Sequence, residues 1–139
     1  MFQGCTSLTS APVLPATTLV QGCYSYMFRD CTSLTTAPAL PAMTLAQYCY
    51  SSMFRSCTSL TTAPALPATT LAINCYYYMF NGCTSLSSVE VAFTTWTSGA
   101  TDNWLKNVAA SGTFTCPSTL PDTRGTSNIP TGWTKVDAA

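Results

Sequence analysis

The amino-acid sequence repeats itself with a period of 26 residues. Met-Phe pairs stand at positions 1, 27, 53 and 79, and each is followed, after two variable residues, by Cys-Thr-Ser-Leu. Three copies are complete, at 1–26, 27–52 and 53–78, and a fourth, partial copy covers 79–91. A repeat of this length cannot bury its apolar side chains alone. The period therefore predicts a stack of coils, one coil for each repeat.

Each repeat also has an internal pattern, which predicts its secondary structure. Leu45, Ala46, Cys49, Tyr50, Met53, Phe54 and Cys57 recur at i, i+1, i+4, i+5, i+8, i+9 and i+12. Spacing of this kind places apolar side chains on one face of a helix. Thr18, Thr44 and Thr70 precede the stripe in the three copies and suit helix N-caps. The second half of the repeat, 33–41 in the second copy, predicts a short extended segment, in which Pro12, Pro38 and Pro64 remove hydrogen-bond donors.

These patterns together predict an α/β repeat fold. The expected architecture is a right-handed leucine-rich-repeat solenoid with short parallel strands, short helices and a C-terminal cap. Positions that are identical between copies should stack in columns along the solenoid, whereas positions that differ should face solvent. The expected structural columns are Cys5, Cys31, Cys57 and Cys83; Cys23, Cys49 and Cys75; Phe28, Phe54 and Phe80; and Leu34, Leu60 and Leu86.

The repeated Met-Phe-x-x-Cys-Thr-Ser-Leu-Thr, followed by Leu-Pro, resembles the BspA-like class of bacterial leucine-rich repeats. That class is typified by a Phe-x-x-Cys-x-x-Leu core, and the resemblance covers residues 1 to about 91. It implies a cell-surface or secreted protein concerned with adhesion or with binding host or matrix proteins. It carries over no catalytic residue. The present repeat departs from the class in its extra length and its Ala-Pro insertion.

Composition argues against several functional classes. Charged residues make up 7% of the chain, and the five basic side chains are scattered, so the sequence predicts no nucleic-acid partner. No apolar run is long enough to span a membrane, and residues 1–5 do not resemble a signal peptide. The chain has no histidine and no Cys-x-x-Cys pair, and its acidic residues are dispersed. We therefore expect no metal, no cofactor and no enzymatic activity.

The cysteines and tyrosines are the remaining candidates for chemistry or binding. Thiols on neighbouring coils could approach closely enough for disulfides, but buried free thiols are the favoured interpretation, since small buried cysteines pack as compact apolar residues. Tyrosines at variable positions suit recognition of a protein or glycan, although they are also ordinary at a solvent edge. These candidate binding residues are Tyr26, Tyr48, Tyr77 and Tyr78.

Residues 92–139 differ from the repeats and predict a capping segment that covers the last coil. A short helix is expected over 104–110, ended by Gly112, and short strands over 113–116 and 133–136. Because no capping sequence precedes Met1, the chain is expected to be the carboxyl-terminal piece of a longer array. An adhesion or interaction module is the leading functional hypothesis. A phage tail or head fibre segment and an accessory domain of an enzyme are the alternatives.

Overall fold

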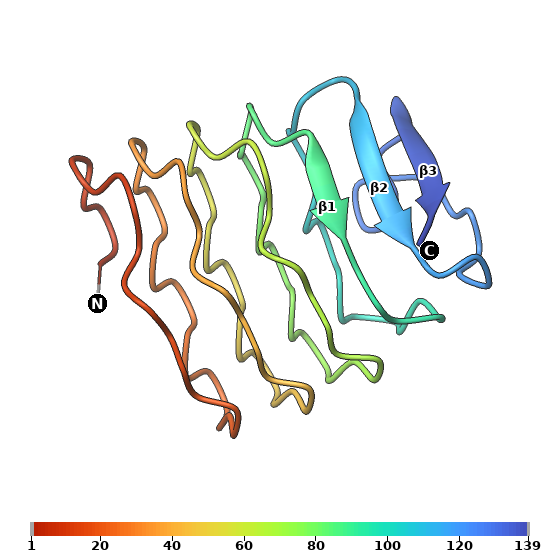
Figure 1. The fold of residues 1–139 in the computed structure, drawn as a ribbon, viewed down its shortest axis with the longest axis horizontal. Helices are drawn as coiled ribbons and strands as arrows, with labels where there is room; N and C mark the ends of the chain where they lie inside the picture. Colours follow the sequence, from red (N-terminus) through yellow and green to blue (C-terminus); the bar gives the residue numbers. More distant parts are fainter. Residues whose placement is uncertain (1, 139) are drawn as a thin grey trace.

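The computed structural model describes residues 2–138 as a stack of coils that lie side by side (Figure 1). Three strands close the C-terminal end: β1 (Ser88–Glu90), β2 (Gly112–Cys116) and β3 (Trp133–Asp137). They form one parallel sheet in the order β1-β2-β3. Val89 pairs with Phe114, and Phe114 pairs with Lys135. The strands expected over 113–116 and 133–136 are therefore confirmed.

The prediction of an α/β leucine-rich-repeat solenoid is wrong, because residues 2–138 contain no helix. The stretches expected to be helical are instead continuous runs of β-turns at 21–30, 47–56 and 73–82, here called the turn segments. The expected helix over 104–110 is also absent, since 102–107 are turns as well. Thr18, Thr44 and Thr70 are not N-caps; they lie in isolated parallel bridges, Thr18 to Thr44 and Thr44 to Thr70.

Backbone hydrogen bonds in the turn segments alternate between two kinds. The amides of Cys23 and Ser25 donate within the segment, to the carbonyls three residues earlier, Val20 and Gly22. The amide of Tyr24 between them donates across to Cys49 of the next coil, over 3.0 Å. Every second peptide thus bonds to the neighbouring coil, and the others close β-turns. The segment satisfies its backbone without forming either a helix or a strand.

A positive φ at every fourth residue produces this geometry. The second turn segment has positive φ at Tyr48, Ser52 and Ser56, and the equivalent residues of the other segments follow the same spacing. A positive φ at the third position is the signature of a type II turn, so type II turns alternate with turns whose central residues have negative φ. The residues with positive φ at equivalent positions are Gly4, Gly22, Tyr26, Asp30, Tyr48, Ser52, Ser56, Asn74, Tyr78, Gly82, Gly99, Asn103 and Asn107.

The helix prediction failed because the apolar period is four residues, not 3.6. An α-helix rotates about 100° per residue, so four residues overshoot a full turn by about 40°, and a stripe of period four winds around the helix. Two consecutive β-turns repeat after four residues without any such drift. The variable positions that carry Gly22, Asn74 and Gly82 were interpreted as solvent-facing. They are the positions of positive φ, which glycine and asparagine adopt most readily.

Substitutions at these positions should change stability in opposite directions. Gly22→Ala should lower the free energy of unfolding by about 1 kcal/mol, because alanine is strained at a φ of +66° and no atom closer than 4.0 Å would clash with its Cβ. Ser56→Gly should raise that free energy by about 0.5–1 kcal/mol, because it relieves the strain at a φ of 63°. Urea unfolding followed by circular dichroism measures both. A loss of stability for Ser56→Gly would contradict the alternating-turn geometry.

On the opposite side of the coils, proline decides where a strand forms. Coils 1 to 3 have only isolated bridges there, such as Ser10 to Thr36 and Thr62 to Ser88. Each of these coils carries two prolines, which have no N–H to donate; in the third coil they are Pro64 and Pro67. In the fourth copy Glu90 and Phe93 stand at these two positions, and β1 ends at Glu90. The strand β1 thus forms in the copy of the repeat that lacks both prolines.

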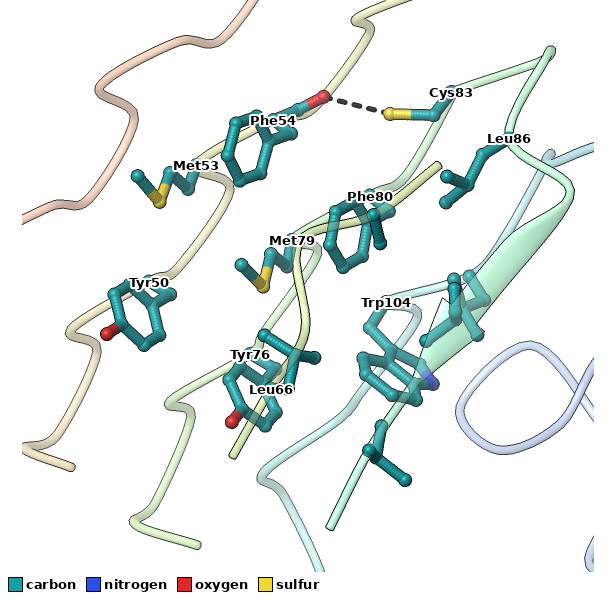
Figure 2. Close-up of a cluster of buried hydrophobic side chains, with 14 of the residues drawn as sticks. Tyr50, Met53, Phe54, Leu66, Tyr76, Met79, Phe80, Cys83, Leu86 and Trp104 are labelled. Carbon is teal, nitrogen blue, oxygen red and sulfur yellow. Dashed lines mark hydrogen bonds between the residues drawn. The ribbon is translucent and has the colours of Figure 1, made fainter. Parts of the chain in front are cut away.

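The core consists of columns in which equivalent side chains stack on one another. Phe2, Phe28, Phe54 and Phe80 stack with ring centroids 5.5–5.6 Å apart, and their ring planes are inclined by 10° or less. Tyr24, Tyr50 and Tyr76 stack at 6.0 Å. Figure 2 shows Met53 and Met79 alongside these rings. The Cys83 thiol donates to the Phe54 carbonyl over 3.0 Å. Leu34, Leu60 and Leu86 are fully buried.

The turn pattern continues beyond the recognisable repeats. Tyr78 and Gly82 donate to the carbonyls of Asp102 and Lys106, one residue before Asn103 and Asn107, which have positive φ. The coil spacing is 25 residues here instead of 26, and Trp104 takes the place of the repeat methionine. The Trp104 ring packs on Tyr76 at 5.8 Å and its indole N–H donates to Asn128, in the loop that follows β2. Residues 92–108 thus build a further coil.

Candidate binding surface

Three of the four candidate tyrosines lie on two adjacent turn segments. Tyr77 and Tyr78 are half-buried neighbours whose rings meet edge to face, with centroids 4.4 Å apart. Tyr48 is exposed and belongs to the adjacent turn segment, where its amide donates to the Ile73 carbonyl. Tyr26 is 43% exposed and shares a column with Tyr78, but Ser52 lies between them. We call Tyr48, Tyr77 and Tyr78 the tyrosine cluster.

Two arginines cover tyrosine rings on this surface. The guanidinium carbon of Arg55 lies 5.0 Å from the centroid of the Tyr78 ring, and that of Arg29 lies 5.7 Å from the Tyr26 ring. Both distances are within the range of a cation–π interaction, which contributes about 0.5–1 kcal/mol at exposed sites. The arginines present their charge at the rim of the aromatic surface. Arg29 also pairs with Asp30 at 3.4 Å.

Tyr77 and Tyr78 are both half-buried, and the hydroxyl of Tyr78 also accepts a hydrogen bond. The side-chain amide of Asn103 donates to the Tyr78 hydroxyl over 3.3 Å, which ties the cluster to the next coil. The pKa of Tyr77 lies above its ordinary value, first because of desolvation and then because Tyr78, Asp102 and Tyr48 disfavour a phenolate beside them. Tyr77 therefore stays a neutral hydroxyl at physiological pH. It can donate or accept a hydrogen bond.

The eight cysteines are free thiols, and six of them are buried. Cys31, Cys57 and Cys83 each donate an S–H bond of 3.0 Å to the carbonyl of Phe2, Phe28 and Phe54 respectively. Cys49, Cys75 and Cys116 are buried as well, whereas Cys5 is half-buried and Cys23 is exposed. Cys23 therefore departs from the favoured interpretation of buried thiols, although it shares a column with Cys49 and Cys75.

Most of the acidic side chains lie in surface ion pairs. Asp122 pairs with Arg124, and Asp137 pairs with Lys135 at 2.9 Å. Within the described part of the chain, no group of three or more cysteine or acidic side chains is placed to hold a metal ion. The same residues contain no helix long and apolar enough to cross a membrane.

No family model, curated protein or solved structure matches the chain significantly.

A shallow apolar groove is also exposed on the repeats. It lies between the second and third coils on the proline side, has a volume of about 380 Å³, and is lined by Ala37, Pro38, Leu40, Pro41, Pro64 and Pro67, among others. These side chains offer no hydrogen-bond donor or charge to orient a ligand. The tyrosine cluster, which combines apolar rings with hydroxyls and a guanidinium, is the better candidate for specific recognition.

Sequence reasoning proposed the tyrosines as candidates but did not include the arginines that lie over two of their rings. Arg29 and Arg55 were interpreted as scattered charges. They occupy the same position in successive copies, and each lies three residues after a position of positive φ, Tyr26 or Ser52. This shared register was the available signal. It could not reveal that Arg55 reaches across to the ring of Tyr78, because that contact joins neighbouring coils.

Proposed function

We propose that this chain is a non-catalytic binding module that attaches to a host or matrix protein or glycan, either at a cell surface or after secretion. The observation that carries the proposal is the edge-to-face pair of Tyr77 and Tyr78, with Arg55 over the Tyr78 ring, next to the turn segment that carries Tyr48. Each of these side chains comes from a turn segment whose backbone is bonded on both sides. The surface is therefore presented in one arrangement before any ligand arrives.

The chemistry of the tyrosine cluster supports recognition of this kind. Tyrosine provides a large apolar face together with a hydroxyl and has few rotatable bonds, so little entropy is lost when it becomes ordered on binding. Tyrosine and arginine are also the side chains that most often dominate binding energy in protein interfaces. An aromatic ring with a hydroxyl beside it also offers stacking and hydrogen bonds to a sugar.

The resemblance of the repeats to BspA-like surface proteins supports the proposed location. The Phe-x-x-Cys-x-x-Leu positions that carry the resemblance form the buried columns, which leaves the outer side of the turn segments free to vary between copies. Tyr48 stands where the other copies have Gly22 and Asn74, and Tyr78 where the second has Ser52. Such variation on a constant core is what a repeat-based binding surface requires.

Tyr77→Ala should reduce binding by about 10-fold or more, because an aromatic side chain at the centre of a recognition surface typically contributes over 1 kcal/mol. The measurement is retention of the full chain on arrays of glycans and extracellular-matrix proteins, followed by titration of each array member that binds. Tyr26→Ala is the matched control, since Tyr26 is exposed but lies outside the tyrosine cluster. Thermal unfolding of both variants establishes that each is folded.

The proposal fails if no array member retains the wild-type chain. It also fails if Tyr77→Ala and Tyr26→Ala bind as well as the wild type does, because the tyrosine cluster would then contribute nothing. Arg55→Ala extends the test: loss of the cation over Tyr78 should weaken binding while leaving the buried columns intact.

A further inference from the structure

Two successive copies of the repeat place an arginine over a tyrosine ring, but only one of these arginines is paired with an acid. Nε of Arg29 lies 3.4 Å from a carboxylate oxygen of Asp30. Ser56 takes the place of Asp30 in the next copy, and Arg55 forms no ion pair within residues 2–138. The guanidinium of Arg29 is thus neutralised by its neighbour, whereas that of Arg55 keeps its positive charge.

The coils on either side of Arg55 bring carboxylates near it without pairing with it. The Asp30 amide donates to the Arg55 carbonyl over 2.8 Å, but the Asp30 carboxylate is engaged by Arg29. On the other side, the Tyr78 amide donates to the carbonyl of Asp102, whose side chain is exposed to water. These two acids repel a ligand that carries many negative charges. A ligand with a single carboxylate, bound at Arg55, fits this distribution better.

The groups around Arg55 are donors and aromatic faces. A guanidinium has five N–H donors in a planar fork that matches the two oxygens of a carboxylate. The Tyr78 hydroxyl accepts its hydrogen bond from Asn103, so its own O–H is available to donate. The Tyr77 ring meets the Tyr78 ring edge to face, with centroids 4.4 Å apart. Such a surface suits a ligand that has a carboxylate, hydroxyls and an apolar face, as an acidic sugar does.

The backbone of the turn segments offers little to a peptide ligand. A peptide that binds by strand addition needs unpaired N–H and C=O groups along the edge it joins. Here the Tyr78 amide is bonded to the following coil, and the Tyr77 carbonyl accepts the amide of Ser52 from the preceding coil over 2.8 Å. Recognition on this surface must therefore use side chains. Aromatic rings, phenols and one guanidinium are groups that suit a sugar ring.

We propose that the tyrosine cluster binds a glycan through a sugar that carries a carboxylate, such as a sialic or uronic acid. Arg55 holds the carboxylate, and the rings of Tyr77 and Tyr78 pack against the sugar. This inference rests on the proposed function and names the class of ligand for the same surface. Ser56 determines the specificity, because an acid at that position would neutralise Arg55 as Asp30 neutralises Arg29.

The test compares acidic oligosaccharides with neutral versions of the same molecules. The full chain is applied to oligosaccharides that end in sialic acid or glucuronic acid, each beside the same compound with its carboxylate reduced to an alcohol. The chain should bind the acid form about 10-fold or more tightly than the reduced form, since hydrogen bonds to a charged group are about twice as strong as neutral ones. Added salt should weaken binding of the acid form only.

Substitution of Ser56 tests the role of the unpaired charge without removing any residue of the tyrosine cluster. Ser56→Asp should lower the affinity for the acid form by about 10-fold, to that of the reduced form, because the new carboxylate occupies Arg55. The backbone accepts this change, since Asp30 and Ser56 have φ of 62° and 63°. Ser56→Asn is the matched control; asparagine also tolerates positive φ but adds no charge, so its affinity should stay within about 2-fold of the wild type.

Each possible outcome supports or overturns the inference. Equal affinity for the acid and reduced forms overturns it, as does equal binding by Ser56→Asp and Ser56→Asn. Retention on a glutamate-rich peptide but on no acidic glycan also overturns it, as does binding to neutral glycans alone. In both of those cases the proposed function stands, provided that Tyr77→Ala abolishes the binding observed. If nothing retains the chain, the inference and the proposed function fail together.

Discussion

Phe54→Ala is expected to lower the free energy of unfolding by about 3–5 kcal/mol, the usual cost of removing a buried phenylalanine. Phe54 is fully buried, and its ring lies between those of Phe28 and Phe80, each 5.6 Å away. Its removal leaves a gap between two stacked rings, which cannot close because the coils on either side are joined by backbone hydrogen bonds. Denaturant unfolding monitored by circular dichroism measures the loss.

Phe2→Ala is the matched control for this substitution. Phe2 belongs to the same column but is only half-buried, and it stacks on a single neighbour, Phe28, at 5.5 Å. Its loss should cost less than half as much as that of Phe54. Equal losses at the two positions would mean that burial does not increase from the end of the stack to its interior, and would contradict the columnar core.

A second large effect is expected in alkaline solution, where three buried thiols alone should cost the protein about 4 kcal/mol of stability per pH unit between about pH 9.5 and 11. Burial raises the pKa of Cys49 to about 11 and that of Cys75 and Cys83 to about 12, from an ordinary value of 9.0. The folded state keeps these three protons after the unfolded chain has released them. The contribution of these three thiols to the free energy of unfolding is therefore complete below pH 9, and it falls as the pH rises toward 11 or 12.

Urea unfolding at intervals from pH 8 to 11 measures this slope. Cys83→Ala removes one buried thiol. The number of protons released on unfolding should therefore fall by about one, and the slope of stability against pH should become smaller in proportion. Leu86→Ala, fully buried three residues away, should lower stability at every pH without changing the slope. If Cys83→Ala changes stability by the same amount at pH 8 and pH 11, the thiols do not govern the alkaline transition.

The buried columns could be predicted from the sequence because they depend only on the repeat. Leu34, Leu60 and Leu86 return every 26 residues, and the register of a stack places them above one another whatever the local backbone does. The backbone of the turn segments could not be predicted in the same way. A stripe of apolar residues at i, i+4 and i+8 fits both an α-helix and a run of alternating turns. In the helix the stripe drifts around the axis by about 40° for every four residues, whereas in the alternating turns it does not drift.

Some residues in the sequence do distinguish alternating turns from an α-helix, but they were interpreted as solvent-facing positions. Gly22, Asn74 and Gly82 indicate positive φ, yet Tyr48, Ser52 and Ser56 fill equivalent places in the second segment and conceal the pattern. Stacking accounts for these exceptions, since amides of neighbouring coils hold each segment in place at alternate residues. For the candidate surface, the sequence indicated the tyrosines by their variability. It could not show that the turn segment of Tyr77 and Tyr78 lies against that of Tyr48.

The alternating bonds of the turn segments give the stack an electrical polarity. Each peptide that bonds between coils points its N–H toward the C-terminal end and its carbonyl toward the N-terminal end, as in the column from Tyr24 through Cys49 and Tyr50 to Cys75. Peptide dipoles of about 3.5 D are therefore aligned head to tail, as in a helix but with the opposite relation to chain direction. Within residues 2–138, the carbonyls of Gln21, Cys23 and Ser25 accept no hydrogen bond, and they form the negative end of the described stack. A lysine or arginine brought to that end would be attracted, and a carboxylate repelled.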